Sequence, residues 1–185
     1  MRLTYKYRLR PTRAQISQLN STLEVCRWVY NETLAARKNA YEQTGQSLGY
    51  YKTKSLLPAW KQGKPELKNV HSQVLQNIVM RVDLAFQAFF RRVKSGEDPG
   101  YPRFRGYGRY RSITYPQYGN GVMLNGSTLR LSKIGDVEVK LHRPVEGTIK
   151  TVTIQRDDNT KWSACFSCDV EPKPLPPTDK IVGID

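Results

Sequence analysis

The hydrophobic period of this 185-residue sequence changes twice, and this constrains the fold more than any other feature. Residues 1–10 alternate between polar and apolar side chains, as in a strand with one buried face. Pro11 ends this pattern, and Thr12 with Gln15 has the spacing of a capping box that opens a helix. Apolar residues then recur at helical steps as far as Gly96, and beyond it the alternation returns.

Two long helices are expected in the first half of the chain. The first runs to about Thr44, where Gly45 is a natural stop, and the second covers roughly 70–94. A shorter polar helix over about 51–57 lies between them and is cut by Pro58. Short strands are expected at about 112–118, 121–124, 127–131, 134–141, 147–156 and 161–170.

Five or more short antiparallel strands favour a small β-barrel. The strand at residues 1–10 is expected to join this barrel, which makes the helical block an insertion. The sequence therefore predicts an α+β fold, with an antiparallel barrel and an inserted helical domain. A proline-rich linker over 171–177 separates the barrel from an apolar segment at 180–185.

The formal net charge is +14, from 30 Lys and Arg against 16 Asp and Glu. A basic excess of this size indicates a polyanionic partner, and nucleic acid is the usual one. No apolar run approaches the ~20 residues of a membrane span, so no membrane partner is expected. Three cysteines are too few for a disulfide framework, which favours a reducing, cytosolic setting.

Two segments are basic and lack acidic residues. The solvent face of the first strand is cationic, and contact with phosphates is its natural use unless it is simply solvated. Residues 99–135 contain six Lys and Arg and no carboxylate. Their first part interleaves arginines with aromatics, which can bind phosphates and stack on unpaired bases, or form a flexible basic loop. The candidate contacts are Arg2, Lys6, Arg8, Arg10, Arg103, Phe104, Arg105, Arg109 and Arg111.

Other patterns are weaker. Gln73 and Gln76 lie one helical turn apart, so they could read adenine edges or form an ordinary polar face. Cys165 and Cys168 are not expected to share a metal, because residues three apart on a strand point to opposite faces. Asp185 follows an apolar strand and could hold Mg²⁺ only with further acids.

Six segments together carry a family resemblance. They are YKYRLRPT (5–12), CRWVYN (26–31), AFFRRVK (88–94), GYPRFR (100–105), TYPQ (114–117) and VGID (182–185). In this order they resemble the TnpB (OrfB) family of transposon-encoded proteins related to type V CRISPR effectors. The resemblance implies four parts in this chain. These are the first strand of a wedge barrel, oligonucleotide-binding-like, at 1–10, a helical recognition domain at 11–104, the rest of the barrel at 105–178, and the start of a RuvC-like nuclease domain at 179–185.

The same resemblance implies the partners. They are a guide RNA from the transposon end and double-stranded target DNA that carries a short flanking motif. In such effectors base pairing reads most of the target, whereas side chains read only the flanking motif. The residues that match the motif-reading cleft are Tyr50, Ser72, Gln73, Gln76 and Gln117, and Lys54 is expected to bind nucleic acid with them.

Asp185 matches the first catalytic aspartate of the family's Mg²⁺-dependent nuclease, whose remaining acids and zinc ribbon would lie beyond it. The sequence is therefore expected to be a truncation, with no cofactor of its own and no cleavage activity alone. One alternative is a split nuclease with its RuvC part on a second chain. Another is an unguided DNA- or RNA-binding regulator. The expected location is the prokaryotic cytoplasm, in association with the nucleoid.

Overall fold

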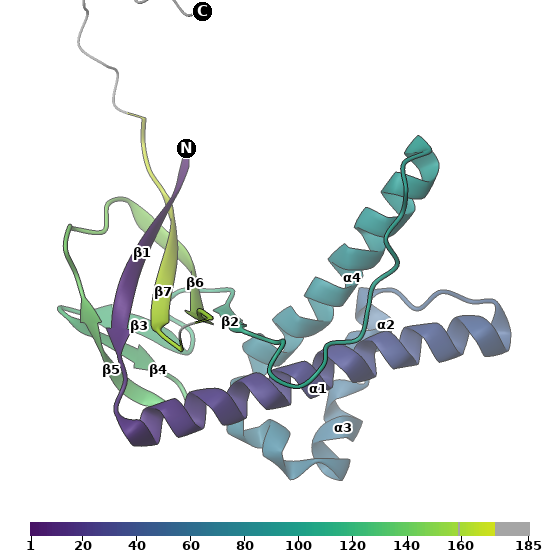
Figure 1. Cartoon of the computed structure of the whole chain (residues 1–185), viewed down its shortest axis with the longest axis horizontal. Helices are drawn as coiled ribbons and strands as arrows, with labels where there is room; N and C mark the ends of the chain where they lie inside the picture. Colours follow the sequence, from purple (N-terminus) through teal and green to yellow (C-terminus); the bar gives the residue numbers. More distant parts are fainter. Residues whose placement is uncertain (159, 173–185) are drawn as a thin grey trace, which may run out of the picture.

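Strand β1 (Arg2–Arg10) lies at the centre of a sheet, although it is the first element of the chain (Figure 1). The structure, a computed structural model, describes residues 1–158 and 160–172. Strand β1 pairs antiparallel with β7 (Trp162–Asp169) on one side and with β5 (Gly135–Lys140) on the other. The sheet has seven strands in the order β2-β6-β7-β1-β5-β4-β3 and curls into a nearly closed barrel. The remaining strands are β2 (Ser112–Tyr115), β3 (Val122–Asn125), β4 (Thr128–Leu131) and β6 (Thr148–Arg156).

The barrel interior follows from the alternation in the sequence. Tyr5, Tyr7 and Leu9 of β1 point inward and are buried, while the residues between them are exposed. The ring of Tyr7 packs edge-on against Phe166 of β7, with 5.7 Å between centroids. The predicted α+β class with an antiparallel, barrel-like sheet is confirmed.

Helix α1 (Arg13–Thr44) begins and ends where the sequence predicts. The Thr12 side chain accepts a hydrogen bond from the Gln15 backbone, and the Gln15 side chain accepts one from the Thr12 backbone. The Gln15 amide also donates to the backbone oxygen of Asp136, 2.6 Å away in β5. The helix start is thereby tied to the barrel. At the other end Gly45 takes a left-handed conformation with φ of +66°.

Helix α4 (Ser72–Ser95) packs against α1 and lies close to β2. Its buried stripe includes Val74, Ile78 and Val82, at four-residue steps, as expected for one face of a helix. Both long helices lie between β1 and β2 in the sequence, outside the barrel (Figure 1). None of the helices in the described residues is long and apolar enough to cross a membrane.

The region between the long helices differs from expectation. Instead of one helix over 51–57, the chain forms α2 (Tyr50–Lys54), α3 (Leu57–Gly63) and a 3₁₀ helix, η1 (Pro65–Asn69). Pro58 does not cut a helix there but stands in the first turn of α3. It fits because the first-turn N–H groups have no intrahelical partner, so its missing donor costs nothing.

Strand boundaries agree with the sequence to within one residue. The exception is β2, expected to run to 118, which ends at Tyr115 because Pro116 has no N–H for the ladder. The segment at 179–185, expected to begin a nuclease domain, lies outside the described residues, as does 173–178 of the expected barrel.

Candidate nucleic-acid interface

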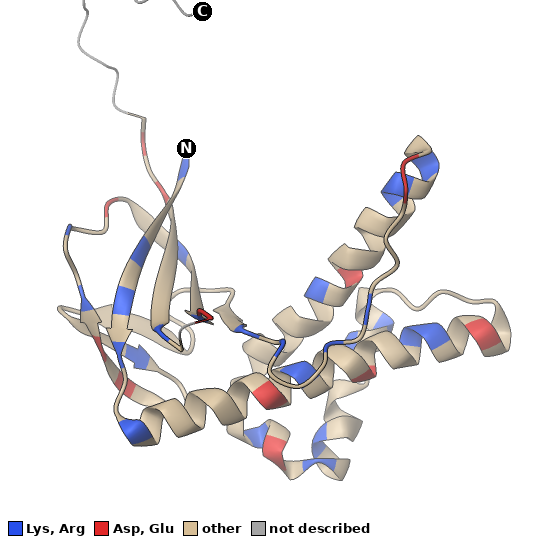
Figure 2. Ribbon diagram, viewed as in Figure 1, with Lys and Arg blue, Asp and Glu red and all other residues tan. Residues whose placement is uncertain are grey.

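The exposed face of β1 carries the four predicted basic residues, Arg2, Lys6, Arg8 and Arg10. Arg2 pairs with Asp169 and Arg10 with Glu138, each at 3.2 Å, and both pairs are exposed. Lys6 and Arg8 have no carboxylate within 4 Å among the described residues. The centre of the strand therefore keeps an uncompensated positive charge (Figure 2).

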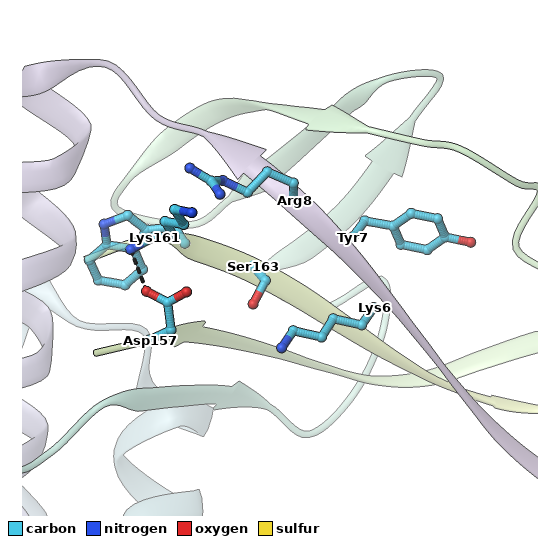
Figure 3. Close-up of a pocket in the computed structure, with 7 residues that line it drawn as sticks. Lys6, Tyr7, Arg8, Asp157, Lys161 and Ser163 are labelled. Carbon is cyan, nitrogen blue, oxygen red and sulfur yellow. Dashed lines mark hydrogen bonds between the residues drawn. The ribbon is translucent and has the colours of Figure 1, made fainter. Parts of the chain in front are cut away.

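A pocket of about 270 Å³ opens beside Lys6 and Arg8 (Figure 3). Lys161 and Ser163 of the neighbouring β7 end line it, together with Asp157. The Asp157 carboxylate accepts a hydrogen bond from the Lys161 backbone at 2.6 Å, which closes the β6–β7 turn. Since that acid already serves the turn, the pocket presents three cations around one engaged carboxylate.

The arginine- and aromatic-rich segment is fastened to α1. The Asn31 side chain accepts a hydrogen bond from the Arg105 backbone at 2.8 Å and donates one to its carbonyl oxygen at 3.0 Å. Arg27 donates a third bond, at 3.3 Å, to the same carbonyl oxygen. The segment returns along α1 after leaving the tip of α4 (Figure 1). Its backbone is held at Arg105, whereas Arg103, Phe104 and Arg109 remain exposed.

Next to the hydrogen bonds that hold Arg105, four arginines line a second pocket of about 360 Å³. Its described lining contains no acidic residue. Two guanidinium groups flank a pair of neighbouring phenol rings there. Arg105 lies 5.6 Å from the Tyr30 ring centroid, Tyr30 and Tyr110 lie 5.9 Å apart, and Arg81 lies 5.9 Å from Tyr110. Burial raises the pKa of Tyr110, so its hydroxyl stays protonated. Arg111 lines the same pocket and pairs with the exposed Asp158.

Sequence reasoning missed Arg81. Its guanidinium donates to the Tyr110 hydroxyl at 3.1 Å and to the carbonyl and hydroxyl of Ser112, and so joins α4 to β2. A signal was available, because Arg81 lies seven residues after Val74 and three after Ile78, on the apolar stripe of the helix. A cation at such a position requires polar partners from another element.

The predicted motif readers Gln73 and Gln117 meet, although they lie 44 residues apart in the sequence. The Gln73 amide nitrogen donates to the Gln117 amide oxygen at 3.1 Å. Ser72, beside them, accepts a hydrogen bond from Lys61 at 3.0 Å. Gln76 is half-buried one turn further along α4. The structure therefore brings the first turns of α4 and the loop after β2 to one place.

We call Ser72, Gln73, Gln76 and Gln117 the glutamine cluster. Three buried polar atoms in this cluster and the residues that flank it lack a hydrogen-bond partner among the described residues: His71 Nδ1, Gln73 Oε1 and Asn77 Oδ1. Buried polar groups in native proteins are nearly always satisfied, so such atoms point to a bound water or ligand. The His71 ring fills the space beside Gly121, where a Cβ would lie 2.8 Å from it. The Gly121 backbone and the His71 ring thus lie in close contact beside the glutamine cluster.

Tyr50 and Lys54 lie on α2, which packs against α4. The Lys54 amine lies 5.6 Å from the centroid of the Tyr50 ring. Neither side chain forms a hydrogen bond with Gln73 or Gln117 in the described part of the chain. The structure therefore places Tyr50 and Lys54 on a helix that contacts α4, without a described hydrogen bond to the two glutamines.

Comparison with known proteins gives the same family as the sequence motifs. A family model of the OrfB group, described as a helix-turn-helix domain, matches residues 1–46. A protein of Escherichia coli (strain K12), named "Putative RNA-guided DNA endonuclease InsQ", is 30% identical over 98% of this chain. A protein of Streptomyces pristinaespiralis with the same activity in its name is also 30% identical over 98%. This chain belongs to the TnpB (OrfB) family. It spans 44% and 45% of the lengths of these two relatives.

In this TnpB-family chain, the segment matched as a helix-turn-helix domain has a different form. Residues 1–46 contain β1 and the single uninterrupted helix α1. The first strand belongs to the barrel and the helix belongs to the inserted block. This segment therefore contains no turn between two helices.

Catalytic and metal-binding candidates contribute little to the described interface. Asp185 lies outside the described residues. No group of three His, Cys, Asp or Glu in the described ranges could hold a metal ion. Cys165 is half-buried and Cys168 is fully buried on β7. The described part of this TnpB-family chain is thus a set of basic and amide-bearing surfaces.

Proposed function

We propose that this chain forms the guide-RNA- and target-DNA-binding part of an RNA-guided DNA endonuclease, and that it recognises a short flanking motif in double-stranded DNA. The observation that carries the proposal is the contact between Gln73 and Gln117, at 3.1 Å, beside buried polar atoms that have no hydrogen-bond partner among the described residues. The activity in the names of the two relatives supports it.

The glutamine cluster suits the reading of base edges. A glutamine amide can bind the N6 and N7 positions of adenine with two hydrogen bonds, each such pair giving about 1–3 kcal/mol of discrimination. Gln73 and Gln76 project from the start of α4, and Gln117 is held beside them by its contact with Gln73. Ser72 and Tyr50 complete the proposed cleft, with Lys54 as a phosphate contact.

The two basic regions suit the nucleic-acid backbone. Each region has two cations without a carboxylate partner among the described residues. They are Lys6 and Arg8 on β1, and Arg105 and Arg109 beside the second pocket. Contacts of this kind position nucleic acid without reading its sequence. As part of this proposal the barrel is a wedge domain, the helical block is a recognition domain, and the location is the prokaryotic nucleoid.

The nuclease chemistry is a separate proposal. In the family the cutting site uses Mg²⁺, which stabilises charge on the attacking and leaving oxygens of a phosphodiester. Asp185 is the candidate carboxylate in this chain. Further acids have to join it, either on the same polypeptide or on a second, RuvC-bearing one.

The decisive experiment compares RNA and DNA binding by the full chain. RNA that co-purifies with it is sequenced, and the complex is then offered target DNA with randomised flanks. We expect one RNA species and enrichment of one flanking motif. Gln73→Ala with Gln117→Ala should flatten that enrichment by roughly 1–3 kcal/mol, whereas Gln46→Ala, on an exposed loop, should leave it unchanged. Tight DNA binding with neither an RNA nor a motif would instead identify an unguided regulator.

A further inference from the structure

The outward-facing residues of four neighbouring strands form a continuous small polar surface. Residues that pair directly across antiparallel strands lie on the same face of the sheet. Lys6 pairs with Cys165, Cys165 with Thr153, and Thr153 with Thr114. A parallel row joins Arg8, Ser163, Gln155 and Ser112. We name the whole surface the hydroxyl face; its members are Thr4, Ser112, Thr114, Thr151, Thr153, Gln155, Ser163, Cys165 and Ser167. Ser163 is buried, Thr4 is exposed and the others are half-buried.

The hydroxyl face has a cationic border on both sides. Lys6 and Arg8 stand along its β1 edge, and Lys161 stands at the end of β7 (Figure 3). At the β2 edge Arg81 reaches in from α4 and donates to Thr114 at 2.5 Å. Cations on opposite sides of a polar strip can hold the phosphates of a backbone that crosses it.

The carboxylates at the ends of the face are already engaged. Asp169 lies between Arg2, at 3.2 Å, and Lys150, at 3.6 Å. Hydrogen bonding from Arg2 lowers the pKa of Asp169, so it stays ionised. Asp157 accepts the Lys161 backbone N–H. The nine members of the face itself include no acidic residue.

The chemistry of the face selects its partner. Serine and threonine hydroxyls donate to phosphate oxygens, and their short side chains allow a backbone to come close. A protein partner needs large apolar anchors. The exposed large apolar residues of the described chain all lie elsewhere, for example Met123 on β3 and Phe104 beyond α4.

We infer that the hydroxyl face, between Lys6, Arg8 and Lys161 on one side and Arg81 on the other, is a binding surface for a sugar–phosphate backbone. This inference deepens the proposed function and rests on it, because it names the surface on which the nucleic acid lies. It extends the cationic edge on β1 into a surface four strands wide, without any role for the glutamine cluster.

The chain carries its own reporter for this surface. Cys165 lies in the middle of the hydroxyl face and is half-buried, whereas Cys26 and Cys168 are fully buried. A small alkylating reagent should therefore modify Cys165 first in the folded chain. Burial raises the pKa of the Cys165 thiol, so rates are compared at one fixed pH.

The test measures iodoacetamide modification of Cys165 by peptide mass spectrometry, with the full chain, alone or with an RNA hairpin or a DNA hairpin of the same sequence. Binding is followed in parallel by fluorescence anisotropy. At about ten times Kd, we expect the bound hairpin to slow modification roughly tenfold, because only about a tenth of the chain remains free. Whichever hairpin slows the modification of Cys165, RNA or DNA, identifies the nucleic acid that supplies the backbone.

A matched pair of variants completes the experiment. Ser167→Asp puts a carboxylate on the hydroxyl face and should weaken hairpin binding by about tenfold or more. Ser127→Asp makes the same charge change in the exposed β3–β4 turn and should have little effect. A hairpin that binds while Cys165 reacts at its free rate overturns the surface and leaves the proposed function standing. Failure of both hairpins to bind overturns the two together.

Discussion

The Arg37 guanidinium of α1 lies 2.6 Å from the Asp83 carboxylate of α4, and both side chains are almost fully buried. Gln87 donates a second hydrogen bond to the same carboxylate at 2.6 Å. The guanidinium also covers the Phe86 ring, 4.2 Å from its centroid. This cluster joins α4, which carries the glutamine cluster, to α1, which holds the arginine-rich segment at Arg105, so it fixes the spacing between the two helices.

Loss of one partner from this pair should destabilise the fold strongly. Asp83→Ala leaves the Arg37 charge buried without a carboxylate, and such a change costs about 3–5 kcal/mol. Chemical denaturation followed by circular dichroism measures the free energy of unfolding. Glu42→Ala is the matched control, because its pair with Lys38 is exposed, at 3.7 Å, and should contribute less than about 0.5 kcal/mol. Equal losses in the two variants would contradict a special role for the buried pair.

The capping box of α1 gives a smaller, local prediction. Thr12→Ala removes the acceptor for the Gln15 backbone N–H and should cost about 1 kcal/mol of unfolding free energy. Thr44→Ala, in the last turn of the same helix, should change stability by no more than about 0.5 kcal/mol. If both substitutions have the same effect in denaturation, the box contributes no more than an average surface threonine.

His71 gives a prediction for the effect of pH. Burial lowers the pKa of His71 in the folded chain, so the unfolded chain binds its proton more readily. This contribution to stability is fully present above the unfolded pKa of about 6.5 and is lost as the pH falls below it. His71→Gln should therefore flatten the fall in melting temperature between about pH 7.5 and about pH 5.5. An unchanged slope would mean that other groups cause the whole pH dependence.

The sequence predicts the elements well because its hydrophobic periods are strong. The capping box at Thr12, the stop at Gly45 and the alternation in β1 all depend on local chemistry. Pro58 was misread because a proline both ends one helix and begins the next, and only the packing of the neighbouring residues decides between them.

The site was harder to predict, because its contacts join distant parts of the chain. The family resemblance placed Gln73 and Gln117 in one cleft, but no local pattern in the sequence puts one beside the other. The hydroxyl face depends on the register of four strands, which the sequence leaves open. Asn31 was missed for a similar reason, since its partner Arg105 lies 74 residues away.

Asn31 provides a test of whether a fixed backbone, apart from charge, matters for nucleic-acid binding. Asn31→Ala removes two hydrogen bonds to the Arg105 backbone and leaves every basic residue in place. A segment that is no longer held must be ordered on binding, so we expect RNA affinity to fall by about 1 kcal/mol, or roughly fivefold. Fluorescence anisotropy with an RNA hairpin measures the change.

Salt dependence separates this effect from electrostatics. The slope of log Kd against log salt reports how many phosphates are neutralised, and it should stay the same in Asn31→Ala. Arg109→Ala should instead reduce the slope by about 0.7–0.9, because it removes an exposed cation without a carboxylate partner among the described residues. Asn39→Ala is the matched control for Asn31→Ala, because Asn39 is exposed on the same helix, α1. It should change neither the RNA affinity nor the salt slope. If Asn31→Ala binds RNA as tightly as the unchanged chain, the hydrogen bonds between Asn31 and the Arg105 backbone serve the fold alone.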